Sequence, residues 1–237
     1  MMNEINDLEK YSIEWGKESN LLERHDIYSY LSKITSSGRV LEFGCGVGNG
    51  TQHLSQEREV LSLENNPSLI KTARSLVNDK VMIRQSDFFN LTDEDRAVIM
   101  GFKPQVIVGW FLGGCGSDVF KHTKEERDFQ NKSKLYREKI EDIIVSPEVC
   151  LASVESIHLV SRGLVDLKYT DDEIFKSQKE DYDKHVFEQV GFEVVEVKNI
   201  DWPIEDSEFQ YGFAHNPNFK GVQAAPMITS ILAKRVK

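Results

Sequence analysis

Apolar and polar positions along the chain alternate with two different periods. Short apolar runs bounded by polar or glycine-rich segments are typical of buried strands, whereas apolar positions three or four residues apart are typical of helices. The first pattern predicts seven strands, at 39–43, 59–64, 81–85, 105–110, 149–154, 193–200 and 228–233. The second predicts two consecutive helices within about 4–35 and further helices at 51–56, 67–77, 92–100, 125–144 and 171–190.

Local signals support several of these helix boundaries. Pro67 stands at a first helical position, where its missing N–H costs nothing. Thr92 and Thr170 are N-cap candidates, and Gly191 is a helix stop signal. Because strands alternate with helices until the last two strands, the sequence predicts a doubly wound α/β fold. Its sheet would be mostly parallel and seven-stranded, with a C-terminal antiparallel hairpin.

The chain shows no internal boundary. No repeat, low-complexity tract or Pro/Gly/Ser-rich linker interrupts its 237 residues. We therefore expect a single domain over 1–237, in which 1–37 form a helical cap and 38–237 form the α/β core.

Composition narrows the class of protein. Three cysteines, Cys45, Cys115 and Cys150, lie far apart and form no C-x-x-C pair, so we expect reduced thiols rather than disulfides or a zinc site. No apolar run reaches the roughly 20 residues of a membrane helix. The start of the chain is polar and acidic, unlike a secretory signal. These features favour a cytoplasmic protein without a membrane span.

The charge balance bears on possible partners. The formal net charge is −10, with 39 acidic and 29 basic residues. Nucleic-acid binding relies on clustered Lys and Arg side chains. The balance therefore argues against a nucleic-acid partner.

A glycine-rich turn is the sharpest motif in the chain. Gly44, Gly46 and Gly48 follow a predicted strand and precede a predicted helix, at the end of a strand where α/β sheets bind ligands. The dinucleotide fingerprint G-x-G-x-x-G does not fit, because its third glycine would fall on Asn49 or Thr51.

Acidic residues mark the ends of three consecutive predicted strands. Glu42 stands two residues before the first glycine of the turn. Glu64 ends the second strand, where a carboxylate can accept both hydroxyls of a ribose. Asp87 follows the third strand, where it can accept an adenine amino group while Phe88 packs on the ring.

In this region the sequence resembles the class I S-adenosylmethionine-dependent methyltransferases. The resemblance is strong over about 38–112 and elsewhere extends only to the order of elements. It implies S-adenosylmethionine as cofactor, with 42–48 around its methionine part, Glu64 at its ribose and Asp87 at its adenine. The expected cofactor site comprises Glu42, Gly44, Cys45, Gly46, Gly48, Glu64, Asn65, Asp87, Phe88, Gly109 and Trp110.

The substrate side is less sharply marked. Methyl transfer requires mainly orientation and exclusion of water, and a base only where the nucleophile arrives protonated. Proton acceptors are expected among Asp118, Glu155 and His158, and substrate contacts among Tyr11, Trp15, Trp202 and Tyr211. Asp118 and His122 alone make a poor metal site, so we expect no metal.

The acceptor is expected to be a small molecule. The Asn/Asp-Pro-Pro-aromatic motif of nucleobase amino-methyltransferases is absent, because residues 109–114 read GWFLGG. Six acids on the expected substrate side favour a cationic acceptor such as an amine: Asp118, Glu155, Asp201, Glu205, Asp206 and Glu208. The alternatives are a protein or peptide side chain as acceptor, a binding protein that has lost transfer, and a dehydrogenase. The aromatic-rich segment 203–226 is expected to cover the site.

Overall fold

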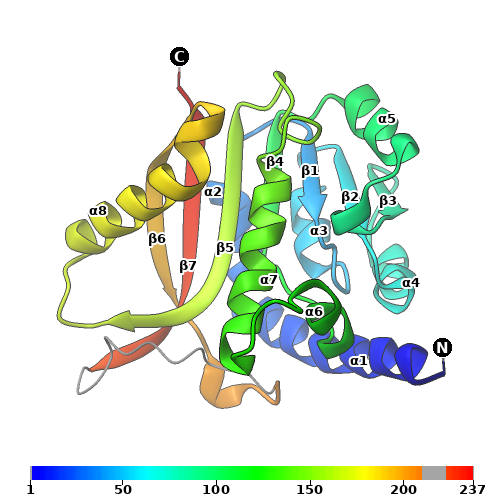
Figure 1. Ribbon diagram of the computed structural model, residues 1–237, viewed down its shortest axis with the longest axis horizontal. Coiled ribbons are helices and arrows are strands. Elements are labelled where there is room, and N and C mark those ends of the chain that lie inside the picture. The colour runs from blue at the N-terminus through cyan, green and yellow to red at the C-terminus, as the bar shows by residue number, and fades with distance from the viewer. Residues whose placement is uncertain (1, 210–222, 237) are drawn as a thin grey trace.

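Seven strands form one sheet in the order β3-β2-β1-β4-β5-β7-β6 (Figure 1). The computed structural model describes residues 2–209 and 223–236, without the side chains of 2–6 and 129–130. The strands are β1 (Val40–Phe43), β2 (Val60–Glu64), β3 (Val81–Gln85), β4 (Val106–Trp110), β5 (Ser156–Asp166), β6 (Phe192–Asp201) and β7 (Ala224–Arg235). The helices are α1 (Met2–Arg24), α2 (Ile27–Ile34), α3 (Asn49–Leu54), α4 (Pro67–Leu76), α5 (Asp93–Phe102), α6 (Gly116–His122), α7 (Phe129–Ile144) and α8 (Asp171–Tyr182). Short single turns are η1 (Phe88–Asn90), η2 (Asp183–Phe187), η3 (Glu188–Val190) and η4 (Ile204–Asp206).

The predicted sheet topology is confirmed. Strands β1 to β5 pair in parallel, and β7 pairs antiparallel with both β5 and β6. β5 leaves β4 at the Trp110–Val160 pair and continues beside β7 as far as Asp166. The β5–β7 ribbon therefore extends past the carboxyl ends of the parallel strands.

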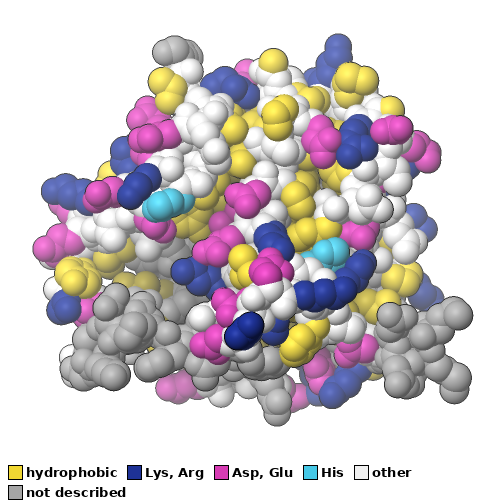
Figure 2. Space-filling model, viewed as in Figure 1, with side chains coloured by type: hydrophobic (Ala, Val, Ile, Leu, Met, Phe, Trp, Pro, Cys, Tyr) yellow, Lys and Arg dark blue, Asp and Glu magenta, His cyan; other side chains and the backbone are white. Residues whose placement is uncertain are grey.

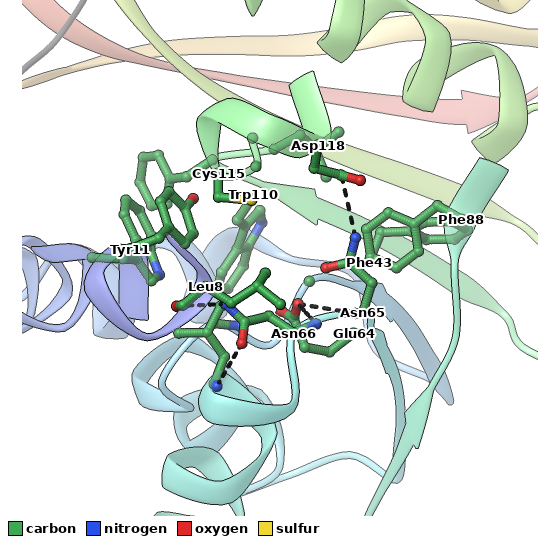
Figure 3. Close-up of a pocket in the computed structure, with 18 residues that line it drawn as sticks. Leu8, Tyr11, Phe43, Glu64, Asn65, Asn66, Phe88, Trp110, Cys115 and Asp118 are labelled. Atoms are coloured by element: carbon green, nitrogen blue, oxygen red, sulfur yellow. Dashed lines mark hydrogen bonds between the residues drawn. The ribbon is translucent and has the colours of Figure 1, made fainter. Parts of the chain in front are cut away.

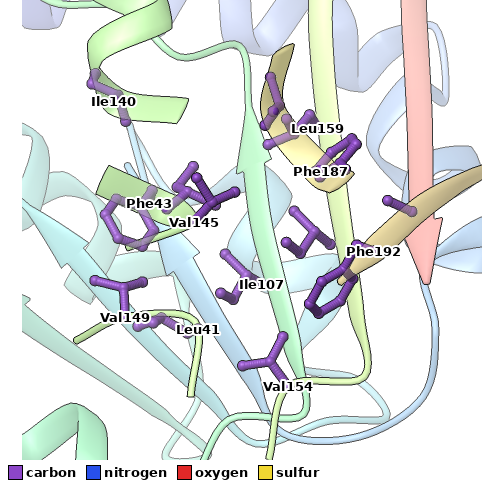
Figure 4. Close-up of a cluster of buried hydrophobic side chains, with 14 of the residues drawn as sticks. Leu41, Phe43, Ile107, Ile140, Val145, Val149, Val154, Leu159, Phe187 and Phe192 are labelled. Atoms are coloured by element: carbon purple, nitrogen blue, oxygen red, sulfur yellow. The ribbon is translucent and has the colours of Figure 1, made fainter. Parts of the chain in front are cut away.

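Helices cover both faces of the sheet. α5, α7 and α8 pack on one face, where their apolar side chains share a core with Leu41, Phe43 and Ile107. Figure 4 shows part of this core, including Ile140 of α7. α1 to α4 pack on the opposite face against Val40 and Val108. Successive residues of β1 and β4 thus point into two different cores, as strands buried on both faces require.

The fifth strand was predicted in the wrong place. Residues 149–154 form a turn and loop, and the strand begins at Ser156. Val149 and Val154 are apolar because they are buried in the core beneath α7, not because they belong to a strand. The observed strand carries polar residues, including His158, whose partners come from distant segments.

The predicted helix at 171–190 ends earlier than expected. Thr170 caps α8 through a capping box with Glu173, as the sequence suggests, but regular α-helix stops at Tyr182. A π-helical turn, η2, and a 3₁₀ turn, η3, follow up to Val190. The carboxylate of Asp183 accepts a hydrogen bond from the backbone N–H of Val194 at 2.6 Å, which ties this turn to β6.

The carboxyl ends of β1, β2 and β4 meet at one edge of the sheet. α1 crosses the molecule at this edge, and α6 lies beside it (Figure 1). Among residues 2–209 and 223–236, no helix is long and apolar enough to cross a membrane.

Candidate functional site

A pocket lies at this edge, between the strand ends, α1 and α6 (Figure 3). Its empty space is about 540 Å³, open solvent included. The lining residues are Leu8, Tyr11, Trp15, Phe43, Gly44, Gly46, Glu64, Asn65, Asn66, Leu69, Phe88, Trp110, Phe111, Leu112, Gly113, Gly114, Cys115 and Asp118. Glu64 and Asp118 are its charged members, so the lining is acidic.

The glycine turn forms one wall of the pocket. Gly44, Gly46 and Gly48 all have positive φ, a conformation that glycine adopts without strain. A β-carbon on Gly48 would lie 2.9 Å from the Cα of Ala73 in α4, so the turn can approach α4 only without a side chain there. The glycine pattern of the sequence therefore has a steric cause.

Glu64 connects the turn to the end of β2. Its carboxylate accepts hydrogen bonds from the backbone N–H groups of Gly46 at 3.2 Å and of Asn65 and Asn66 at 3.0 Å each. Burial raises the pKa of Glu64 to about 7, although these three donors lower it. A buried acceptor in the pocket wall is thus close to its titration midpoint at neutral pH.

Glu42 lies beneath the turn rather than in the pocket lining. It is buried and accepts a hydrogen bond from the Thr51 hydroxyl at 2.8 Å. Burial raises its pKa to about 7. Cys45 and Gly48 also lie in the turn without lining the pocket.

The third strand end places its two predicted residues differently. Phe88 is buried, lines the pocket and packs on Phe43 with ring centroids 5.2 Å apart. Asp87 caps η1 by accepting from the backbone N–H of Phe89 and lies 3.5 Å from the Lys121 ammonium of α6. Its carboxylate lies outside the pocket lining.

Asp118 is the acid that α6 brings into the pocket. It accepts hydrogen bonds from the Asn65 amide at 3.3 Å and from the Tyr136 hydroxyl, and lies 3.5 Å from His122 Nε2 (Figure 3). His122 stacks on Phe89 at 3.9 Å, and burial lowers its pKa. Within the described residues, no group of three or more His, Cys, Asp or Glu side chains is arranged to hold a metal ion.

The aromatic residues predicted on the substrate side come from α1 and from the end of β6. Tyr11 and Trp15 line the pocket, and burial raises the pKa of Tyr11. The Arg162 guanidinium of β5 lies over the rings of Trp15 at 5.0 Å and Trp202 at 5.7 Å. Trp202 itself is outside the pocket lining and donates to Glu18 at 3.3 Å.

Three further predicted residues, Glu155, His158 and Gly109, lie outside the pocket lining. Glu155 directly precedes β5, at the sheet edge opposite the pocket, because the strand starts later than predicted. His158 is buried between Thr35 and Ser230 at 2.7 Å each, and burial lowers its pKa to about 3. Gly109 lies within β4, where Leu159 and Ile144 pack closely. Tyr211 and most of 203–226 lie outside the described residues.

Several lining residues escaped prediction from the sequence. Asn66 caps α4 and donates to the Leu8 carbonyl oxygen and to Ser12, each at 3.2 Å, so it joins the pocket to α1. A β-carbon on Gly114 would lie 2.8 Å from the hydroxyl oxygen of Tyr136, which is too close for a side chain. The helical spacing of Leu8 with Tyr11 and Trp15 is the one local signal that indicated part of this set.

The similarity of this chain to known proteins lies in its three-dimensional structure. No protein-family model and no curated protein sequence matches the chain. Solved structures do match. A chain from the complex of the Haloferax volcanii Trm112 methyltransferase activator with its proposed methyltransferase is 11% identical, with a TM-score of 0.50, and the match covers 97% of this chain and 98% of that one.

Two further solved structures match with lower TM-scores. TYW2 of M. jannaschii, solved with AdoMet, is 12% identical with a TM-score of 0.48, over 92% of this chain and 77% of that one. Precorrin-6y C5,15-methyltransferase of Geobacter metallireducens is 13% identical with a TM-score of 0.46, over 89% and 88%. At such identities the likeness concerns the fold. The chain therefore has the fold of the class I S-adenosylmethionine-dependent methyltransferases.

Proposed function

We propose that the chain is an S-adenosylmethionine-dependent methyltransferase that acts on a small amine, with residues 1–37 as a helical cap. The observation that carries the proposal is the buried Glu64 carboxylate, held in the pocket wall beside the glycine turn at the carboxyl edge of the sheet. On this fold, ligands bind at that edge.

The chemistry of the lining fits the cofactor. Glu64 can accept from ribose hydroxyls, Phe88 offers an apolar surface to the adenine, and Gly44 with Gly46 brings backbone without side chains beside the methionine part. Asn65 is placed next to Glu64 and can donate to the nucleoside. When bound, S-adenosylmethionine supplies a methyl group on a positively charged sulfur.

Asp118 has two tasks in this proposal: it binds the amine and accepts a proton from it. An amine is mostly protonated at neutral pH, and its nitrogen must lose a proton before it can attack. The Asp118 carboxylate lies in the pocket and can bind the ammonium form and then take the proton. Hydrogen bonds from Asn65 and Tyr136 fix the orientation of this carboxylate. The aromatic side chains of α1 exclude water from the same space.

The charge of the pocket favours a cationic acceptor over an anionic one. Its charged lining residues are Glu64 and Asp118, both acidic. An acidic cleft attracts cations and repels carboxylates. Glu208 and Asp206, which were expected to add to this charge, lie near Lys17 at 2.5 Å and His25 at 4.0 Å instead. The preference therefore rests mainly on Asp118.

Methyl-labelled S-adenosylmethionine with panels of amines, carboxylic acids and phenols tests the proposal. We expect label transfer to amines only, and we expect Asp118→Asn to reduce it by about 10²-fold or more, as loss of a general base does. Asp142→Asn, which removes an exposed acid from α7, serves as the matched control. Transfer confined to acids or phenols would overturn the amine assignment. A wild-type protein that shows no calorimetric binding of the cofactor would overturn the methyltransferase itself.

A further inference from the structure

Helix α1 closes the pocket by direct contact with the glycine turn. Indole Nε1 of Trp15 lies 2.5 Å from the position that a β-carbon on Gly46 would occupy. Trp15 is also buried, and Leu8 and Tyr11 from the same helix line the pocket beside it. The methionine part of the cofactor therefore cannot rest against Gly46 from this side while Trp15 stays where it is.

The two halves of α1 are anchored very differently. In the second half, Glu18, Ser19, Leu21 and Leu22 are buried. In the first half, the side chains at 7–14 are half-buried or exposed, and only Trp15 at its end is buried among those described.

Both halves of α1 also make polar contacts with other segments. The second half is joined to Asn49, which donates to Ser19 and Asn20 at 3.1 Å each. The first half is joined to Asn66, which donates to the Leu8 carbonyl oxygen and to Ser12, and to Ser117, whose exposed hydroxyl donates to Asp7 at 2.6 Å. Because fewer side chains of the first half are buried, it is the easier half to lift.

Gly16 lies at the boundary between these halves, directly after Trp15. A glycine inside a helix weakens it, because its backbone has the most freedom to regain. Packing does not require glycine here, since a β-carbon would find only Val47 Cγ1 at 3.5 Å, an ordinary contact. Its φ is not positive either, in contrast to the glycines of the turn. What glycine supplies at this position is a weak point in the helix.

We propose that Gly16 is the hinge of a gate formed by residues 2–15. The first half of α1 swings away with Trp15, admits the cofactor to the pocket beside the glycine turn, and closes again over it. The second half stays fixed on the sheet. The identity of the ligand rests on the proposed function, whereas the hinge itself rests on α1 alone.

Gly16→Ala tests the hinge, because alanine fits the space and strengthens the helix. Surface plasmon resonance with S-adenosylhomocysteine measures both rate constants. If the gate must open for both entry and exit of the ligand, the association and dissociation rate constants should each fall by about fivefold, while Kd stays unchanged. The factor corresponds to the gain in helix stability when alanine replaces one glycine. Gly101→Ala is the matched control, since Gly101 lies in α5 with nothing near its β-carbon position.

The outcomes separate the hinge from the proposed function. Wild-type rate constants in Gly16→Ala would overturn the hinge. Absence of binding to the wild type would overturn the cofactor assignment, and hydrogen exchange would then decide the hinge. Amides of residues 7–15 should exchange together in the wild type and about fivefold more slowly in Gly16→Ala, but not in Gly101→Ala. Unchanged exchange in Gly16→Ala would overturn it.

Discussion

Glu64 joins three backbone segments through a single carboxylate. The N–H groups that it binds belong to the turn after β1 and to the two residues after β2. Burial outweighs these donors and raises the pKa of Glu64 to about 7. Near neutral pH the side chain therefore exists in both protonation states. A ligand that offers two hydroxyl donors binds the ionised state.

We expect the affinity for S-adenosylhomocysteine to rise with pH between 6 and 8. At pH 6 most Glu64 side chains carry a proton that must leave before ribose hydroxyls can donate to them. With a pKa near 7, this requirement weakens binding roughly tenfold relative to pH 8. Calorimetric titration at the two pH values measures the difference.

Two variants assign that dependence to its residue. Glu64→Gln should bind more weakly at pH 8 and lose the dependence on pH. Glu141→Gln removes a carboxyl of α7 whose pKa burial also raises to about 7, but which does not line the pocket. It should keep the wild-type profile. Equal affinity of the wild type at both pH values would contradict the role given to Glu64.

At the scale of elements, two glycines of the turn differ in what a side chain would cost: backbone strain alone at one, and backbone strain with a steric clash at the other. Gly44 and Gly48 both have positive φ, at 82° and 101°. A β-carbon on Gly44 would meet nothing within 4 Å, whereas one on Gly48 would press on Ala73 of α4 at 2.9 Å.

Gly48→Ala should therefore destabilise the protein more than Gly44→Ala. We expect a loss of about 2–4 kcal/mol in the free energy of unfolding for the first and about 1–2 kcal/mol for the second, where only φ is strained. Urea denaturation of both variants gives the comparison. Equal losses would show that α4 moves aside and that the close approach is not required.

The elements that sequence patterns predicted best are those whose side chains are explained locally. β1 and β2 are short apolar runs that end at glycine or acid. α4 begins at the predicted Pro67, and α5 and α8 follow the predicted caps Thr92 and Thr170. β5 was misplaced because its signal is not local. His158 and Arg162 are acceptable inside this strand only because Thr35, Ser230 and Glu18 reach them from other elements.

At the scale of the whole molecule, charge decides which partners are compatible. The chain carries a net charge of −10, and Figure 2 shows acidic and basic side chains interspersed over the face of α7 and α8. Binding of a polyanion draws its affinity from clustered cations that release counterions.

We therefore expect no stable complex with RNA. Gel-shift titration with a total tRNA pool at about 50 mM salt should show no retarded species, since the net negative charge opposes binding of a polyanion. Labelled methyl groups should likewise fail to enter the RNA pool. A complex that weakens steeply with added salt would contradict this expectation and redirect the search for an acceptor to nucleic acids.

Only part of the pocket was predictable from the sequence, because one of its walls is formed by elements that meet through long-range packing. Gly44, Gly46, Glu64 and Phe88 lie within or directly after consecutive strands, so chain order alone brings them together. The opposite wall comes from α1 and from the segment after β4, and its position depends on how whole helices pack. From this wall, sequence patterns predicted Tyr11, Trp15 and Asp118, but not Phe111 or Gly114, whose places follow from that packing.

All three tryptophans of the chain gather around this one site. Trp15 and Trp110 line the pocket, and Trp202 shares the Arg162 guanidinium with Trp15. Indole emission changes in colour and intensity with the polarity around the ring. The fluorescence of the unmodified protein is therefore an optical sensor of this site, without a contribution from tryptophan elsewhere. Candidate acceptors can be screened for binding by tryptophan fluorescence, and the screen also detects molecules that bind without being methylated.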